Sequence, residues 1–539
     1  MFIHSAWHDR FNRWATRSRG ILSLALLLCV LPGCLSVSRK TSKTEDIKPL
    51  EIRQVKPASV FGDHMVLQRD MQIPVWGTAD VGETVTVALN AQKKTTVADT
   101  DGKWTVRLDA VEAGGPFEMT IAGKNTVTFK DVYVGEVWLC SGQSNMDMTV
   151  AKEDRYWCGV NNEAQEVAEA DYPLIRVFDV EFTPKDEPQN DAKGAWEICS
   201  PKTVGHFSAA AYFFARQLHK KLNVPIGLVT TAYGGSTAEA WTSRTALTAN
   251  PTTGFLLEEY KKRNEEYDSG WAQKKYEQNL ADWQKASEQA KADNKRAPKK
   301  PGGPKNPHQD QHSPCVLYNG MVDPLVPYAI RGAIWYQGES NGPTAKIYDK
   351  IMETLIQDWR QAWGQGSFPF LYVQLANYNK GGQTLLVREG QLKNLSIPNT
   401  AMAVTIDIGD ADNIHPKNKQ DVGLRLSLAA RALAYGESIP YMGPIYDSMS
   451  VEGNSVRLRF KHIDGGLVAK GGELKGFAIA GENKKFVPAD AKIDGETIVV
   501  SSSETAKPIA VRYGFDNNPQ ISLYNKADLP ASPFRTDDF

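Results

Sequence analysis

Cysteine is scarce in this chain, with six among 539 residues, and no two stand in a Cys-x-x-Cys spacing. Because structural zinc sites commonly use such pairs, the sequence predicts no zinc site. Four cysteines follow residue 34: Cys140, Cys158, Cys199 and Cys315. Their spacing defines no disulfide pairs, and Cys140 lies in an apolar segment that favours a buried free thiol.

The chain also has no large excess of positive or negative charge, since its formal net charge is −1. No global field therefore attracts nucleic acid or an anionic membrane surface, and we expect no nucleic-acid partner. The chain has no His-Glu-x-x-His, no P-loop and no Gly-x-Gly-x-x-Gly after a strand. Neither a metal nor an organic cofactor is expected.

No apolar run is long enough to span a bilayer stably, and the one at Ile21–Leu31 follows four arginines between residues 10 and 19. Residues 1–34 therefore predict an export signal. The signal ends in Leu31-Pro32-Gly33-Cys34, which resembles a bacterial lipobox except for the proline. We expect a lipid on Cys34, a tether over residues 35–58, and a membrane contact only through this anchor, in the periplasm or at the cell surface. A plain cleaved signal peptide is the alternative.

Three regions with distinct sequence patterns follow the tether. Residues 59–131 and 441–539 contain short alternating runs such as Thr84–Leu89 and Ser455–Phe460, separated by turn residues. This pattern predicts an antiparallel β domain at each end. Residues 132–440 between them are expected to form a separate catalytic domain.

The middle region alternates apolar bursts with helical patterns. Unbroken bursts suit strands that are buried on both faces, and strands alternating with helices predict a doubly wound parallel α/β sheet. The bursts are Val132–Cys140, Ile175–Val180, Ile226–Thr231, Ala333–Tyr336, Phe370–Leu375 and Ala401–Ile406. Ligands bind beyond the carboxyl ends of strands in such sheets. Residues 253–313 interrupt the alternation with a charged stretch, which predicts a solvated helix or helical hairpin followed by an irregular loop.

Small or polar residues follow four of these bursts. They are Ser141–Met146, Tyr233–Ser236, Gln337–Asn341 and Asp410–His415. Because parallel strands deliver their carboxyl ends to one edge of the sheet, these four segments are expected to meet there.

A serine hydroxyl needs a base that accepts its proton, usually a histidine oriented by a carboxylate. Ser144 follows Gly142, which permits a sharp turn. Of nine histidines, only His415 follows a core strand and has an acid, Asp412, three residues earlier. We therefore expect Ser144, Asp412 and His415 to be catalytic. Asp407 and Asp410 are alternative carboxylates.

The ordered blocks resemble those of the SGNH hydrolases, an esterase superfamily on a flavodoxin-like sheet, and most of all its sialate O-acetylesterase branch. The resemblance extends to Phe61–Arg69, Leu317–Met321 and Ile414–Gln420. It implies a doubly wound sheet flanked by the two β domains and an acyl-enzyme mechanism.

Acyl transfer also requires donors aimed at the developing oxyanion. The backbone N–H groups of Ser144 and of Gly235, next to Gly234, are two candidates. Where many SGNH enzymes carry an asparagine as third donor, this chain has Gln337, with Glu339 as a supporting acceptor. Asn145 is a further supporting residue, whereas Arg388 and Glu389 have no defined role. Tyr156, Trp157, Tyr233 and Trp241 offer apolar faces to a sugar or pack in the core.

The sequence thus predicts a carbohydrate O-acetylesterase that acts on acetylated sugars or polysaccharides, O-acetylated sialic acid foremost. An acetylxylan or pectin acetylesterase is one alternative. A catalytically inactive glycan-binding surface lipoprotein is another, and a lipid esterase ranks last because no apolar lid segment is visible.

Overall fold

The structure is a computed structural model that describes residues 54–539. The predicted signal peptide and Cys34 lie outside the described residues. Within residues 54–539, no helix has the length and hydropathy needed to cross a membrane.

The largest sheet has eleven strands, seven of which follow the order β10-β9-β11-β8-β12-β13-β14. Neighbouring strands in this row are parallel, except for the edge strand β10, which is antiparallel to β9. Their bounds are β8 Thr126–Gly142, β9 Tyr172–Val180, β10 Gly194–Cys199, β11 Ile226–Ala232, β12 Gly332–Tyr336, β13 Phe370–Gln374 and β14 Thr400–Val404. The six apolar bursts of the sequence all fall on these strands, and the predicted parallel sheet is confirmed.

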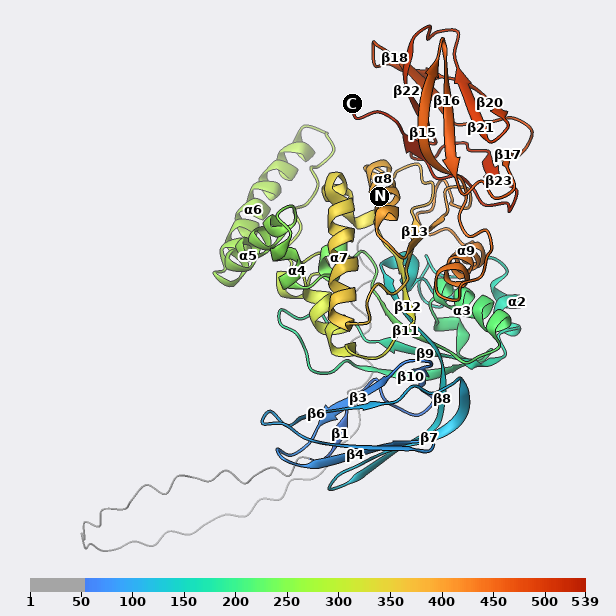
Figure 1. Cartoon of the computed structure of the whole chain (residues 1–539). Helices are drawn as coiled ribbons and strands as arrows, with labels where there is room; N and C mark the ends of the chain where they lie inside the picture. Colours follow the sequence, from blue (N-terminus) through green and yellow to red (C-terminus); the bar gives the residue numbers. More distant parts are fainter. Residues whose placement is uncertain (1–53) are drawn as a thin grey trace, which may run out of the picture. The chain divides into compact units, whose positions relative to one another are not determined.

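Helices cover this sheet on both sides. In Figure 1, α7 lies on one side of β12 and β13, with α3 and α9 on the other. The helices are α1 Ser144–Asp147, α2 Glu163–Ala168, α3 Ala209–Leu222, α7 Tyr348–Trp363, α8 Thr384–Lys393 and α9 Lys419–Leu433. The Ser208 hydroxyl caps α3 by accepting from the Ala211 N–H, and Asn418 caps α9 in the same way. Every residue of β12, β13 and β14 is buried, as the unbroken apolar runs require.

Antiparallel strands precede the parallel sheet, and β8 belongs to both regions. In the large sheet β7 pairs antiparallel with β8, β4 with β7 and β5 with β4, whereas the short β2 pairs parallel with β8. Strands β1, β3 and β6 form a separate three-stranded sheet. Their bounds are β1 Lys56–Pro57, β2 Val66–Gln68, β3 Ile73–Thr78, β4 Thr84–Leu89, β5 Gln92–Val97, β6 Lys103–Leu108 and β7 Gly114–Ala122. Burial alternates along β4 and β6, as predicted. The domain boundary placed at residue 131 stays a prediction, because β8 runs through it without a break.

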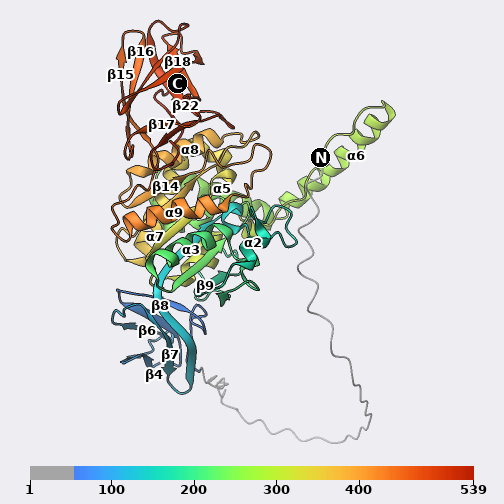
Figure 2. The ribbon, with the colours of Figure 1, turned by 90° about the vertical axis from the view of Figure 1, so that its right-hand side faces the viewer.

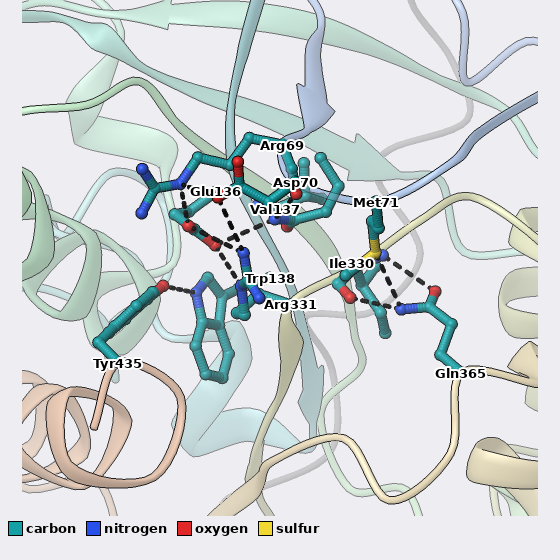
Figure 3. A network of polar contacts seen from close by, with 11 residues as sticks. Arg69, Asp70, Met71, Glu136, Val137, Trp138, Ile330, Arg331, Gln365 and Tyr435 are labelled. Carbon is teal, nitrogen blue, oxygen red and sulfur yellow. Dashed lines mark hydrogen bonds and ion pairs between the residues drawn. The ribbon is translucent and has the colours of Figure 1, made fainter. Parts of the chain in front are cut away.

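A buried carboxylate joins the antiparallel region to the parallel one (Figure 3). Glu136 of β8 is fully buried, and its two oxygens accept from Arg69 Nε at 2.5 Å and from Arg331 Nε at 2.7 Å. Gln68 Nε2 adds a third bond at 3.1 Å. Arg69 follows β2 and Arg331 precedes β12, so one side chain holds both regions. Removing one partner of such a buried ion pair typically costs about 3–5 kcal/mol.

The last hundred residues form small antiparallel sheets with their own hydrophobic core, centred on Leu458, Ile479 and Tyr513. Figure 2 shows them next to α8. The strands are β15 Ile445–Glu452, β16 Ser455–Lys461, β17 Leu467–Ala469, β18 Phe477–Gly481, β19 Phe486–Pro488, β20 Asp490–Asp494, β21 Thr497–Ser501, β22 Pro508–Tyr513, β23 Leu523–Asn525 and β24 Phe534–Arg535.

The charged stretch is helical, as the sequence predicts. It contains α5 Gly254–Asp268 and α6 Trp271–Ala292, preceded by α4 Arg244–Ala249. No residue of α6 is buried, whereas Leu256, Leu257 and Tyr260 of α5 are. His308 lies between Asp186 and Asp268, 2.6 and 3.1 Å away, and so links the loop after α6 to α5 and to the loop after β9.

Short turns complete the chain: η2 Val204–His206, η3 Ala238–Trp241, η4 Pro307–Gln309, η6 Asp323–Leu325, η7 Glu339–Ile347, η8 Asn394–Ser396 and the π-helical η5 Tyr318–Val322. The four cysteines of the described region are buried and free.

Candidate active site

Three of the four polar segments start at the same level of the sheet. In the parallel ladder, Gly142 at the end of β8 pairs with Ala232 of β11 and with Tyr336 of β12. The segments that follow, beginning at Gln143, Tyr233 and Gln337, therefore leave adjacent strands side by side. This position is the one predicted for the site.

Ser144 and His415 form a hydrogen-bonded pair, with Ser144 Oγ and His415 Nε2 2.8 Å apart. Ser144 opens α1 after a turn at Gly142, whose φ is 148°. A side chain at Gly142 would collide with the Tyr336 carbonyl, so the turn requires glycine.

The imidazole of His415 is poised to accept a proton. Burial, reinforced by the charge of Lys419, lowers the pKa of His415 to about 4. The ring is therefore neutral at neutral pH, and its free Nε2 can accept the Ser144 proton.

An aromatic ring lies against this imidazole. The Trp157 and His415 ring centroids are 4.8 Å apart, and the Arg155 guanidinium lies 4.9 Å from the Trp157 centroid. Arg155 in turn pairs with Asp147, three residues after Ser144, at 3.1 Å. Sequence reasoning named Trp157 as a sugar face or a core residue and gave Arg155 and Asp147 no role, because no motif marks them.

The structure does not bring Asp412 to His415. Asp412 is exposed, its carboxylate accepts from Asn379 Nδ2 at 3.3 Å, and it makes no hydrogen bond to the imidazole in the part of the chain that the structure describes. The Asp410 carboxylate accepts the N–H groups of Asp412 and Asn413, and this turn directs Asp412 outward. The expected Asp412–His415 contact is thus absent, and a catalytic role for Asp412 stays a prediction.

The two alternative carboxylates do not replace it. Asp407 forms a bidentate ion pair with Arg425, at 2.6 and 2.7 Å. Asp410 is occupied by the backbone of its own loop.

Two of the expected oxyanion donors are free of hydrogen-bond partners among the described residues. The backbone N–H groups of Ser144 and Gly235 donate to no acceptor within residues 54–539, so both are available. Gly234 lies closer to the nucleophile than Gly235 does: a Cβ on Gly234 would be 3.6 Å from Ser144 Cβ, whereas one on Gly235 would meet Gln311.

Gln337, the third expected donor, is directed elsewhere. It is fully buried, and its Nε2 donates to the Ser236 carbonyl at 3.1 Å and to Asn341 Oδ1 at 2.6 Å. Both amide hydrogens are therefore used, and the Tyr348 hydroxyl donates to Gln337 Oε1 at 2.9 Å. In this structure the Gln337 amide supports the strand-end turn, and its role as an oxyanion donor stays a prediction.

The supporting residues Asn145 and Glu339 do meet, and they meet at a lysine that sequence reasoning missed. Asn145 Nδ2 donates to Glu339 Oε1 at 2.6 Å, and Lys419 Nζ donates to Asn145 Oδ1 at 2.9 Å. Burial lowers the pKa of Lys419 to about 7, partly offset by the charge of Glu339, while burial raises the pKa of Glu339. The signal that could have pointed to Lys419 is a charged residue at the start of a helix whose first turn is buried.

Arg388 and Glu389 belong to a different contact. Arg388 is buried and donates to the carbonyls of Leu375 and Asp516, and Glu389 pairs with Arg535 at 3.0 Å. They join α8 to the C-terminal sheets.

Of the remaining aromatic candidates, Trp241 is fully buried, whereas Tyr156 is 74% exposed. Tyr233 stacks on Phe182, with ring centroids 3.6 Å apart. Within residues 54–539, no group of three or more His, Cys, Asp or Glu side chains is placed to hold a metal ion.

Comparison with known proteins places the chain in a family. The model of the family described as carbohydrate esterase, sialic acid-specific acetylesterase, matches residues 134–293 and 309–434. The sialate O-acetylesterase of Mus musculus is 32% identical, over 88% of this chain and 93% of its own length; that of Homo sapiens is 31% identical, over 88% and 91%.

A solved structure, that of a carbohydrate acetylesterase from Xanthomonas citri, superimposes with a TM-score of 0.76 at 36% identity, covering 90% of this chain and all of that one. The residues matched by the family model include the segments that carry Ser144, Gly234 and His415. The chain therefore belongs to the sialic acid-specific acetylesterase family of carbohydrate esterases.

Proposed function

We propose that this esterase removes acetyl groups from sugars through an acyl-enzyme formed on Ser144. The observation that carries the proposal is the 2.8 Å contact between Ser144 Oγ and His415 Nε2. Ser144 Oγ attacks the acetyl carbonyl while His415 takes its proton. His415 then returns the proton to the departing sugar oxygen, and a water activated by the same histidine releases acetate.

The oxyanion of each tetrahedral intermediate would face the free N–H of Ser144 and that of Gly235, beside Gly234. Each such donor typically contributes about 2.7–4 kcal/mol of transition-state stabilisation. Asp412 would take part only if its loop turned toward His415.

The parallel strands support a flavodoxin-like SGNH arrangement as part of this proposal. Without β9 and β10, the row β11-β8-β12-β13-β14 is 2-1-3-4-5 in chain order. Ligands in that topology bind where strand order reverses, beside the first strand. Ser144 follows β8, which is that strand.

The proposed substrate is O-acetylated sialic acid, because the curated relatives are named sialate O-acetylesterases. Acetylated xylan or pectin is the second candidate, since the Xanthomonas citri structure is titled only a carbohydrate acetylesterase. Phe182, 39% exposed and stacked on Tyr233 next to Gly234, provides an apolar face for a sugar ring.

Two comparisons test the proposal. The first measures kcat/KM on O-acetylated sialic acid, acetylated xylan and acetylated pectin fragments. Preference for a plant polysaccharide would refute the sialate assignment and leave the esterase standing. The second compares the parent and Ser144→Ala on a chromogenic acetate ester, where retained turnover in Ser144→Ala would refute the acyl-enzyme. A purely glycan-binding protein would hydrolyse none of these esters.

A further inference from the structure

His415 is the base of the proposed reaction, yet no carboxylate within residues 54–539 hydrogen-bonds its ring. Its position must therefore be fixed in another way. The backbone on both sides of it is held by buried side chains. Asn145 Nδ2 donates to the Ile414 carbonyl at 3.0 Å, and Lys419 Nζ donates to the Pro416 carbonyl at 2.6 Å.

These two side chains also bond to each other and to Glu339. Lys419 Nζ donates to Asn145 Oδ1 at 2.9 Å, and Asn145 Nδ2 donates to Glu339 Oε1 at 2.6 Å. Asn145 thus uses both amide hydrogens and its oxygen, and it and Lys419 are at most 1% exposed. Satisfied, buried polar groups of this kind hold one geometry, because any displacement leaves a polar atom unpaired.

Glu339 supplies a counter-charge for the ammonium of Lys419. Its carboxyl end is enclosed, and Oε2 has no hydrogen-bond partner within residues 54–539. A buried lysine and a half-buried glutamate joined through one asparagine compensate each other's charge without direct contact.

The covalent connection makes the arrangement specific to the reacting pair. Asn145 directly follows Ser144 and lies in the same short helix, α1. The side chain that holds the His415 loop is therefore fixed to the turn that carries the nucleophile. The distance from Ser144 Oγ to His415 Nε2 depends on these contacts.

We propose that Asn145, Lys419 and Glu339 position His415 against Ser144 and so perform the orienting function that the sequence assigned to Asp412. They are positioning residues, since none of them touches the reacting atoms. The inference rests on the proposed roles of Ser144 and His415. In this chain the three side chains would take the place of the carboxylate of a catalytic triad.

The test measures the rate at which an organophosphonate serine reagent labels Ser144, together with kcat and KM on a chromogenic acetate. Asn145→Ala and Lys419→Met should slow labelling and lower kcat by about 100-fold, the scale of a reacting group displaced by about 1 Å. KM should change little. Glu339→Gln keeps the acceptor for Asn145 and should lose less than Asn145→Ala.

Two controls make the result specific. Lys417→Met removes an exposed lysine from the same loop and should behave as the parent. Asp412→Asn removes an exposed carboxylate and should slow labelling by less than about fivefold. If Asn145→Ala fails to fold, the labelling rate of Asp412→Asn still tests the proposal. This variant should fold, because an exposed side chain contributes little to folding.

The pH dependence of kcat/KM on the acid side provides a further test, because a residue with a purely structural role would not shift it. The charged or titratable groups around the His415–Lys419 pair are Glu339, Cys158, Arg155, Asp147 and Tyr336, whose ring centroid lies 5.4 Å from Lys419 Nζ. Because the Lys419 charge lowers the pKa of His415, Lys419→Met should shift the acid limb to higher pH.

The proposal would be overturned by parent-like labelling in folded Asn145→Ala and Lys419→Met, or by an Asp412→Asn that loses as much as His415→Ala. Continued turnover in Ser144→Ala is a separate outcome, because it would remove the proposed function and the inference with it.

Discussion

The environment of His415 sets the pH range of the reaction. Its pKa is lowered to about 4 by burial and by Lys419, so the imidazole is a free base over most of the physiological range. The hydrogen bond from Ser144 needs that free base. Asp412 contributes nothing to this state in the structure, since it faces Asn379.

We expect kcat/KM on a chromogenic acetate to stay constant as the pH falls toward about 4 and to be lost below it. The sign follows from the role of His415 as a base: protonation removes its ability to accept the Ser144 proton. A pH–rate profile of the free enzyme measures this limb. An acid limb near the ordinary histidine pKa of about 6.5 would show that the ring is solvated or paired with a carboxylate.

Gln337 provides a second test at the scale of one side chain. Gln337→Met keeps the volume but leaves the Ser236 carbonyl without its side-chain donor. Asn341 Oδ1 still accepts from the Ala238 N–H, and the Tyr348 hydroxyl still donates to the backbone carbonyl of residue 337. The free energy of unfolding, measured with urea, should fall by about 1–3 kcal/mol for each buried group left unpaired. Unchanged stability with a kcat lowered about 100-fold to 1,000-fold would instead place the amide in the oxyanion hole.

Strands and helices were largely predictable, because their signals are local. Apolar segments marked all six parallel strands, and helical patterns were expected between them. The site was only partly predictable. Strand ends pointed to Ser144, Gly235 and His415, whereas the bond between Lys419 and Asn145 joins residues 274 positions apart and leaves no local pattern. The turn at Asp410, which directs Asp412 outward, depends on a side chain competing for backbone N–H groups.

The two helices of the insert differ in how they are held. Tyr260 of α5 is 2% exposed and its hydroxyl bonds to Asp186, while α6 buries no residue. The side chains of Asp268 and His308 are 3.1 Å apart, so a short linker can replace what lies between them.

Deleting residues 270–305 should therefore leave the melting temperature and the turnover of a chromogenic acetate close to those of the parent. Deleting 258–305 also removes Tyr260 and should cost about 3–5 kcal/mol, as loss of a buried aromatic does. Thermal unfolding of the two variants makes the comparison. Equal destabilisation by both deletions would mean that α6 packs on a surface the fold depends on.

At the scale of the whole molecule, the large sheet passes from the antiparallel region into the catalytic one through β8, and the Glu136 ion pairs hold this junction. Ser144 lies at the opposite end of the same strand. The family match spans the parallel sheet and most of the insert, and the curated relatives cover 88% of the chain.

Export and anchoring also belong to this scale. The apolar segment before Leu31-Pro32-Gly33-Cys34 leads us to propose a lipid on Cys34. Cys34→Ser should move the protein from the membrane fraction to the soluble one, or leave the precursor uncleaved, while the specific activity stays that of the parent. Fractionation and mass spectrometry of both proteins test this, and identical behaviour would exclude lipidation.

The central claim is that Ser144 carries the acetyl group. It is tested most directly by inactivating the purified enzyme with an organophosphonate serine reagent and mapping the modified peptide. The account predicts one label, on Ser144, that rises in parallel with the loss of acetate release and does not form in His415→Ala. A label on another residue at full inactivation, or full activity with Ser144 modified, would contradict it.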